Sequence, residues 1–247
     1  MADDTLIVDD ADGVRTITIN RPEVKNALTA AMRTRLCELL DEADTDAATR
    51  VVIVTAVDPV FSAGVDFKEV AAGTAGASSR NPGKALRAMT TPVLCAVNGA
   101  CVTGALEIAL SCTFVVASER ARFADTHARL NVVAAWGLTA LLPRVVGVRK
   151  AAEMSITGNF VDADEALRLG LVNHVVSHEE LLPFTRAIAR DIAPTGAVAE
   201  VLDLYRRGDG VSVADALVLE ADHNAGRRVD PHAFGAAGSV AAARNKS

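Results

Sequence analysis

Patterns that mark several large classes of protein are missing from this chain of 247 residues. None of its four cysteines forms a CxxC pair, and its five histidines show no metal-ligand spacing with them, so the sequence predicts no bound metal. The motifs GxGxxG, GxxxxGKS/T and GxSxG are absent too, which removes the usual signals of a dinucleotide site, a phosphate-binding loop and a nucleophilic serine. We expect small buried side chains in a reducing compartment at Cys37, Cys95, Cys101 and Cys112.

Long apolar runs and an excess of positive charge are missing as well. No stretch is apolar for long enough to span a bilayer, and the first residues, MADDTLIVDDADG, are acidic and lack the apolar centre of a signal peptide. We therefore expect a cytoplasmic protein without a membrane partner. The formal net charge of −6 argues against a nucleic-acid partner, because phosphate backbones attract basic surfaces.

Half of the residues are apolar, which is enough to bury a large core. Alternating or β-branched segments predict strands, and strands that alternate with helices indicate an α/β fold with parallel pairing. The alternating segment 14–20 predicts a half-buried strand, whereas 50–57 predicts a strand buried on both faces. Further strands are expected at 92–97, 113–117 and 172–176, and helices at 28–44, with Thr29 near its cap, and at 104–111.

The strand signals stop at about residue 179, and three helical stretches follow at about 179–192, 196–207 and 212–228. We interpret residues 1–190 as a core domain and residues 191–247 as an appended helical region. The loop 71–83, AAGTAGASSRNPG, is rich in glycine, alanine and serine, so it is either a lid over a site or a surface connector.

Two glycine-containing turns follow buried strands. The first is 61–69, FSAGVDFKE, after the strand 50–57, and the second is 98–107, NGACVTGALE, after the strand 92–97. A turn between a strand and a helix start leaves backbone N–H groups unpaired. If the two strands are neighbours, two such groups converge on one oxygen and stabilise an oxyanion. Taken singly, each turn is weak evidence and is more simply interpreted as an ordinary glycine turn.

Together with their surroundings, these segments carry a resemblance. The order NRPEVKNAL (20–28), FSAGVDFKE (61–69), PVLCAVNGACVTGALEIALSC (92–112) and RFADTHARL (122–130), followed by ADEALRLGLVNHVV (163–176), resembles the crotonase family, the enoyl-CoA hydratase/isomerase superfamily. The resemblance implies a spiral of ββα units with a C-terminal helical trimerisation region, hence a homotrimer or a hexamer. It also implies acyl-CoA as the substrate, with coenzyme A entering as part of it and no separate cofactor.

The resemblance also assigns site residues. It places the oxyanion hole at the backbone N–H groups of Val65 and Gly104, and Gly104 stands at a predicted helix N-terminus, where the dipole favours negative charge. The core domain would then bind and process the acyl-CoA, and the helical region would serve oligomerisation. Residues expected to bind CoA or the acyl group are Val24, Lys25, Ala63, Asp66, Phe67, Lys68 and Trp136.

Glu107 is the acid in the otherwise apolar stretch GALEIALSC, and it matches one of the two catalytic glutamates of the hydratases. Burial among apolar residues would raise its pKa and suit it to proton transfer. The alternative is a glutamate in the first turn of a helix that points to solvent.

The second catalytic glutamate aligns with His127, so this sequence carries an imidazole in its place. Three interpretations stay open: His127 is a replacement acid or base, it binds substrate or hydrogen-bonds Asp125 without transferring protons, or it is structural. If the segment is extended, Asp125 points to the same side as His127.

The function expected from these residues is syn addition of water to a 2-enoyl-CoA. Because the second glutamate is missing, a single-carboxylate isomerase, decarboxylase or thioester hydrolase is an alternative, and a non-catalytic acyl-CoA binder is another.

Overall fold

The computed structural model describes residues 5–73 and 80–227, and the chain divides into two compact units, residues 1–199 and 200–247. Part of the loop 71–83 and the end of the C-terminal region therefore lie outside the described residues. In the first unit, six strands form one sheet in the order β1-β2-β3-β4-β6-β9. The strands are β1 (Leu6–Ala11), β2 (Val14–Ile19), β3 (Val51–Ala56), β4 (Val93–Val97), β6 (Phe114–Ser118) and β9 (His174–Val176).

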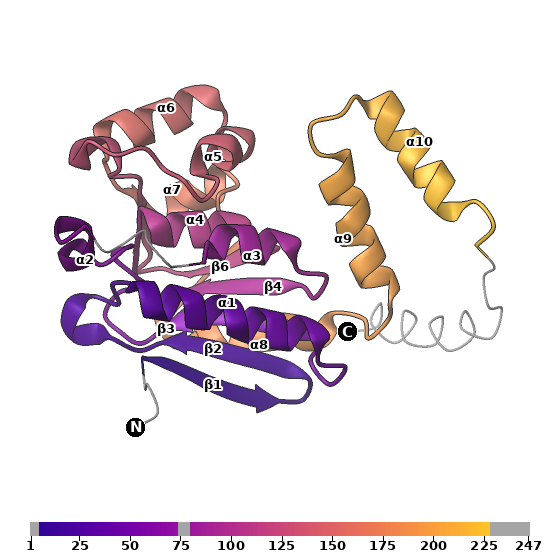
Figure 1. The fold of residues 1–247 in the computed structure, drawn as a ribbon, viewed down its shortest axis with the longest axis horizontal. Helices are drawn as coiled ribbons and strands as arrows, with labels where there is room; N and C mark the ends of the chain where they lie inside the picture. The colour runs from indigo at the N-terminus through magenta and orange to yellow at the C-terminus, as the bar shows by residue number, and fades with distance from the viewer. Residues whose placement is uncertain (1–4, 74–79, 228–247) are drawn as a thin grey trace. The chain divides into compact units, whose positions relative to one another are not determined.

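All neighbours in this sheet pair in parallel except β1 and β2. Parallel strands need crossover connections, and the helices α1 (Ala30–Thr45), α3 (Pro82–Ala88) and α4 (Gly104–Ser111) supply them on one face (Figure 1). Thr29 caps α1, as predicted, because its side chain accepts a hydrogen bond from the N–H of Met32 at 3.2 Å. Strands β3 and β4 lie side by side, which is the condition that the oxyanion argument requires.

The other face of the sheet is also covered. Helix α8 (Leu181–Asp191) packs against β2, β3, β4 and β6, and its Leu181 and Ala189 belong to a second apolar cluster with Val14. Ile17 and Ile19 belong to the larger cluster on the α1 side. The expectation that 14–20 is half-buried was therefore wrong, because β2 is an inner strand whose apolar residues face two cores.

The sequence patterns did not predict the strand β1, LIVDDA, because its apolar residues do not alternate with polar ones and most of its side chains are exposed. Its antiparallel partner is β2, and the turn between them consists of Asp12 and Gly13, both with positive φ (54° and 76°). An Asp-Gly pair between two strands is a strong hairpin signal, so the information was present in the sequence.

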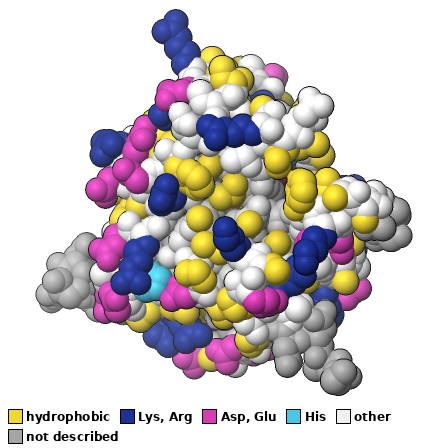
Figure 2. Space-filling model, turned by 90° about the vertical axis from the view of Figure 1, so that its left-hand side faces the viewer, with side chains coloured by type: hydrophobic (Ala, Val, Ile, Leu, Met, Phe, Trp, Pro, Cys, Tyr) yellow, Lys and Arg dark blue, Asp and Glu magenta, His cyan; other side chains and the backbone are white. Residues whose placement is uncertain are grey.

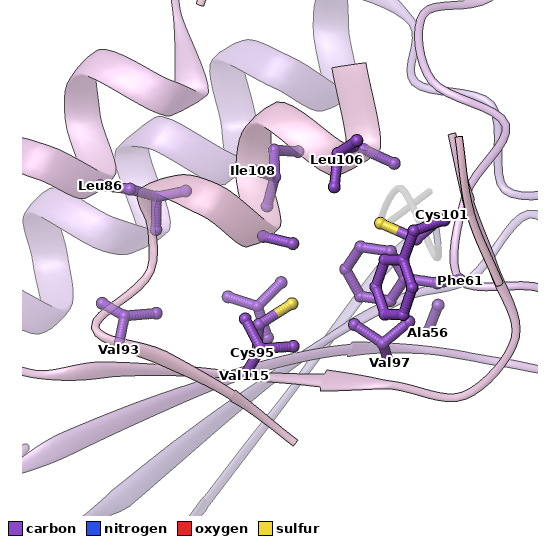
Figure 3. Packing of buried hydrophobic residues seen from close by; sticks show 14 of the residues in the cluster. Ala56, Phe61, Leu86, Val93, Cys95, Val97, Cys101, Leu106, Ile108 and Val115 are labelled. Atoms are coloured by element: carbon purple, nitrogen blue, oxygen red, sulfur yellow. The ribbon is translucent and has the colours of Figure 1, made fainter. Parts of the chain in front are cut away.

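A second, three-stranded sheet in the order β5-β7-β8 stands at the carboxyl ends of the first sheet's strands. It consists of β5 (Ala100–Val102), β7 (Arg122–Ala124) and β8 (Val161–Asp162), which are too short to give a pattern in the sequence. Cys101 of β5 and Cys95 of β4 pack as buried apolar side chains with Phe61 and with Ile108 of α4 (Figure 3), as expected for these cysteines.

The remaining helices of this unit are the short 3-10 helices η1 (Pro22–Val24), η2 (Ala128–Leu130) and η3 (His178–Glu180), with α2 (Phe67–Ala71), α5 (Leu138–Val146), α6 (Val148–Thr157) and α7 (Ala163–Arg168). Helix α9 (Ala197–Gly208) leads into the second unit, which contains α10 (Val213–Asn224). In that unit the Glu200 carboxylate forms an ion pair with His223 at 2.9 Å. No helix within residues 5–73 and 80–227 is both long and apolar enough to cross a membrane.

Candidate active site

The two predicted turns meet above the ends of β3 and β4. Backbone hydrogen bonds join the first turn to β5: Ser62 N–H donates to Ala100 O at 3.0 Å, and Val102 N–H donates to Ser62 O at 3.1 Å. Gly64 lies so close to the second turn that a Cβ at this position would be 3.2 Å from the backbone nitrogen of Gly104. The backbone on either side of Val65 and Gly104 is therefore held together by the two sheets.

Neither the N–H of Val65 nor that of Gly104 donates a hydrogen bond to another residue in the described ranges. Gly104 is the first residue of α4, where the helix dipole adds positive potential. Thr103, just before it, has a φ of 51°, a conformation that costs a non-glycine residue energy. These are two backbone donors suited to one oxyanion.

The turns open into a pocket of about 670 Å³. Its walls come from η1, the first turn, α2, the start of α4 and the stretch from β7 to α5. The lining is mostly apolar, with charged groups at a few positions, as is usual for small-molecule sites. The lining residues are Val24, Ala27, Arg33, Ala63, Val65, Asp66, Phe67, Lys68, Val70, Thr103, Gly104, Glu107, Thr126, His127, Leu130, Val132, Val133, Ala135 and Trp136.

Glu107 stands in the first turn of α4 with only 2% of its surface exposed, so the interpretation as a solvent-facing glutamate was wrong. Its Oε1 accepts hydrogen bonds from the N–H groups of Trp136 at 2.6 Å and Leu138 at 3.3 Å. Its Oε2 faces the pocket side, 3.7 Å from His127 Nε2. Burial raises the pKa of Glu107, and the two backbone hydrogen bonds offset this only in part.

His127 follows the short strand β7 and is partly buried. Its Nδ1 lies 2.7 Å from Asp125 Oδ1, and its backbone N–H donates to the same oxygen at 3.1 Å. Of the three interpretations of His127, the hydrogen bond to Asp125 is present in the structure. It arises because the chain turns after β7, not because the segment is extended.

Most of the predicted site residues meet at this one pocket. Lys25 does not line it: its side chain is exposed, and its backbone carbonyl accepts a hydrogen bond from Ala63 N–H at 3.0 Å. Lys68 and Phe67, which is 65% exposed, stand on α2 at the wall of the pocket. The Asp66 side chain caps α2 by accepting from Lys68 N–H at 2.9 Å and forms an ion pair with Arg21.

Several pocket residues were not predicted, and Arg33 is the most unexpected. It is buried, with 4% of its surface exposed, and its guanidinium lies 5.6 Å from the centre of the Trp136 ring and 3.9 Å from the Glu69 carboxylate. Burial lowers its pKa. An arginine on α1 gives no sequence signal for this position, since arginines on helices usually face solvent.

Trp136 closes the pocket beside Gly104. A Cβ at Gly104 would lie 2.9 Å from Cζ3 of the Trp136 ring, so the indole rests directly against the glycine. Arg87 fixes the backbone here by donating to Trp136 O at 2.6 Å and to Ser111 Oγ at 2.8 Å. These contacts place Trp136 in the pocket wall and make Arg87 part of its support.

Figure 2 shows the side of the molecule that carries α2. Apolar side chains gather near the middle of this face, and lysine and arginine side chains are scattered among them. The exposed apolar residues of the pocket wall include Phe67, Val70, Leu130, Val132 and Val133, the last with 82% of its surface exposed. Such a mixed surface fits a ligand with both apolar and anionic parts.

The chain is similar to known proteins over most of its length. Residues 9–222 match the model of the family described as enoyl-CoA hydratase/isomerase. The chain is 37% identical over 216 residues to a probable peroxisomal enoyl-CoA hydratase 1 of Arabidopsis thaliana, which covers 85% of this chain and 82% of that protein. It is 32% identical over 231 residues to a crotonyl-CoA hydratase of Syntrophomonas wolfei, covering 90% and 89% of the two chains. A crystal structure of an enoyl-CoA hydratase from Mycobacterium tuberculosis H37Rv aligns with a TM-score of 0.77 at 47% identity, over 89% of this chain and 96% of that chain.

Proposed function

Because the chain belongs to the enoyl-CoA hydratase/isomerase family, we propose that it is an acyl-CoA-processing enzyme that adds water in the syn sense to a 2-enoyl-CoA. The observation that carries the proposal is the convergence of two unpaired backbone N–H groups with a buried carboxylate on one pocket. No separate cofactor takes part, since coenzyme A enters as part of the substrate. The crotonase-type fold expected from the sequence motifs is the fold observed.

In this proposal the thioester carbonyl oxygen accepts hydrogen bonds from the N–H groups of Val65 and Gly104. Attack at the β-carbon moves electrons onto that oxygen, so these donors bind the enolate-like transition state more tightly than the substrate. The helix dipole of α4 acts in the same direction. Both donors belong to backbone that the two sheets hold in place, so little reorganisation accompanies the reaction.

The proton transfers fall to Glu107 and His127. Oε2 of ionised Glu107 takes a proton from water as the water oxygen bonds to the β-carbon, and protonated His127 gives its Nε2 proton to the α-carbon. The protons balance in this step. Water loses one proton to Glu107, and the α-carbon gains a different proton from His127. Proton exchange between Glu107 and His127, whose facing atoms lie 3.7 Å apart, restores the starting state.

The CoA part of the substrate is proposed to lie along η1 and α2, with Val24, Ala63, Asp66, Phe67 and Lys68 beside it. Lys25 contributes through its backbone, because its side chain does not line the pocket. Trp136 bounds the acyl group on the side of Gly104.

The proposed function is tested by turnover of a short 2-enoyl-CoA. We expect loss of the conjugated thioester absorbance and formation of a 3-hydroxyacyl-CoA, identified by mass. Binding of CoA thioesters in calorimetry without turnover of any member of an acyl-CoA panel would instead identify a non-catalytic binder. Conversion to an isomer, a decarboxylated product or a free acid would identify one of the alternative reactions.

Gly104→Ala tests the oxyanion hole. The added methyl group would meet the Trp136 ring at 2.9 Å and obstruct the approach of the carbonyl oxygen, so we expect kcat/KM to fall by about 10²-fold. The same substitution combined with Trp136→Phe removes the contact with the outer ring of the indole. If the double variant regains full activity, the loss came from displacing Trp136, and the oxyanion assignment of Gly104 would be contradicted.

The second unit is proposed to serve oligomerisation, as the resemblance implies for residues 191–247. Within that unit, apolar side chains of the helices are exposed, including Tyr205 at 73%, Val213 at 77% and Leu217 at 59%. Exposed apolar area of this kind is commonly covered by another protein surface. Light scattering of the purified chain should give a trimer or a hexamer, and a monomer at micromolar concentration would contradict this.

A further inference from the structure

The Asp125 carboxylate is buried directly behind His127 and does not line the pocket. It comes one residue after β7 ends, and its Oδ1 accepts both the backbone N–H of His127, at 3.1 Å, and the ring Nδ1, at 2.7 Å. The side chain of Ser155, on α6, forms a further hydrogen bond with this carboxylate. The carboxylate is thus held by two separate segments and in turn holds the imidazole from behind.

This arrangement determines which ring nitrogen faces the reacting groups. Burial alone would raise the pKa of Asp125, but hydrogen bonds from His127 and Ser155 outweigh it and lower the pKa, so Asp125 is a carboxylate. A carboxylate only accepts hydrogen bonds, so Nδ1 of His127 carries a proton. In the neutral ring, Nε2 then has its lone pair free and directed toward Glu107 Oε2, at 3.7 Å.

A second Asp–His pair in the same unit shows that this arrangement is not a general feature of the chain's histidines. Nε2 of His178 lies 3.0 Å from Asp58 Oδ2, and its Nδ1 lies 3.1 Å from Ser118 Oγ. Both ring nitrogens of His178 are therefore occupied by protein groups, and neither Asp58 nor His178 lines the pocket. In His127, by contrast, one nitrogen is anchored and the other meets Glu107 in the pocket wall.

We propose that Asp125 is a positioning residue that lets an imidazole take the place of the second catalytic glutamate. It holds His127 with Nε2 toward the pocket, and its negative charge stabilises the imidazolium that donates a proton to the α-carbon. The inference deepens the proposed function and rests on it for the catalytic step, whereas the tautomer of His127 can be observed without any turnover.

The proton balance of the cycle shows why the carboxylate matters. Asp125, His127 and Glu107 share one mobile proton, which sits on His127 before water adds. That proton goes to the α-carbon, and the proton from water goes to Glu107 Oε2. Transfer from Glu107 to Nε2, directly after a small side-chain rotation or through one water, then regenerates the imidazolium. The negative charge of Asp125 favours the imidazolium that forms in this last step.

The substitution that tests this is Asp125→Asn, because asparagine keeps an oxygen for the His127 N–H and a polar partner for Ser155 while removing the charge. We expect kcat to fall between about 10- and 100-fold with little change in KM, a loss of the size seen when the partner behind a metal-bound histidine is removed. Asp58→Asn is the matched control, since it changes the Asp–His pair outside the pocket, and it should leave kcat unchanged.

A double-mutant cycle separates positioning from a structural role. If Asp125 acts through His127, Asp125→Asn lowers kcat in the wild-type background but has no further effect on kcat in a His127→Gln background. Equal losses in the two backgrounds would overturn the proposal, and so would an unchanged kcat for Asp125→Asn alone.

Nitrogen NMR of the histidine ring gives a readout independent of activity. The wild-type signals that are missing from the spectrum of His127→Gln belong to the His127 ring. At a pH where the ring is neutral, we expect the shifts of these signals to be those of the Nδ1–H tautomer. An Nε2–H tautomer would overturn the inference. If the chain shows the Nδ1–H tautomer but does not hydrate enoyl-CoA, the proposed function fails while the placement of His127 by Asp125 stands.

Discussion

Glu107→Gln is expected to lower kcat for hydration by about 10³-fold with little change in KM, because the glutamine cannot accept the proton of the attacking water. The glutamine oxygen can still accept from the N–H groups of Trp136 and Leu138, so the pocket wall should keep its position. Steady-state kinetics with a short 2-enoyl-CoA measures the effect. Glu153→Gln, on exposed α6 surface, is the control and should behave as the wild type. Activity retained by Glu107→Gln would remove Glu107 from the mechanism.

The same variant should be more stable than the wild type at neutral pH. Burial raises the pKa of Glu107 above its ordinary 4.5, so the folded chain holds the Glu107 proton more tightly than the unfolded chain does. The unfolded chain releases this proton at lower pH than the folded chain does. Stability of the wild type therefore decreases as the pH rises from 4.5 to the raised pKa. The Tm difference between Glu107→Gln and the wild type should grow across this window, and a lower Tm of the variant at neutral pH would contradict the assigned direction.

His127→Gln is expected to lower kcat by about 10²-fold, because glutamine can form hydrogen bonds but cannot deliver a proton to the α-carbon. The result separates the three interpretations of this residue. A pure role in binding would raise KM with kcat unchanged, and a structural role would lower Tm without a specific loss of kcat. His178→Gln alters a histidine with similar Asp contacts outside the pocket and serves as the control. A normal kcat for His127→Gln would contradict the role as proton donor.

Much of the site followed from sequence because it depends on local backbone geometry. Gly104 begins a helix in the structure, as the pattern of 104–111 predicts. Strands β3 and β4 are neighbours, which the convergence of the two N–H groups on one oxygen requires. Residues that matter through long-range contacts were harder to foresee. Arg33 reaches the pocket only because α1 packs beside Trp136, and nothing around residue 33 in the sequence indicates this.

Around His127, too, some features follow from the sequence and others depend on contacts that only the folded chain makes. The alignment of motifs brings His127 to the position of a second glutamate, and the structure places its ring beside Glu107. Its hydrogen bond to Asp125 depends on a turn after β7, and β7 has three residues, which is too short for a periodic signal. Ser155 on α6, which lies far along the chain, completes the surroundings of Asp125, and that contact exists only in the folded molecule.

The central claim is that this pocket adds water to carbon, and isotopic labelling tests it most directly. The wild-type chain is incubated with a short 2-enoyl-CoA in water enriched in ¹⁸O, and the products are analysed by mass. Hydration predicts one ¹⁸O atom at the β-carbon of a 3-hydroxyacyl-CoA, and an initial rate of formation of this product that is about 10³-fold lower with Glu107→Gln. Label in a released carboxylic acid, or an isomerised or decarboxylated thioester without label, would contradict the account.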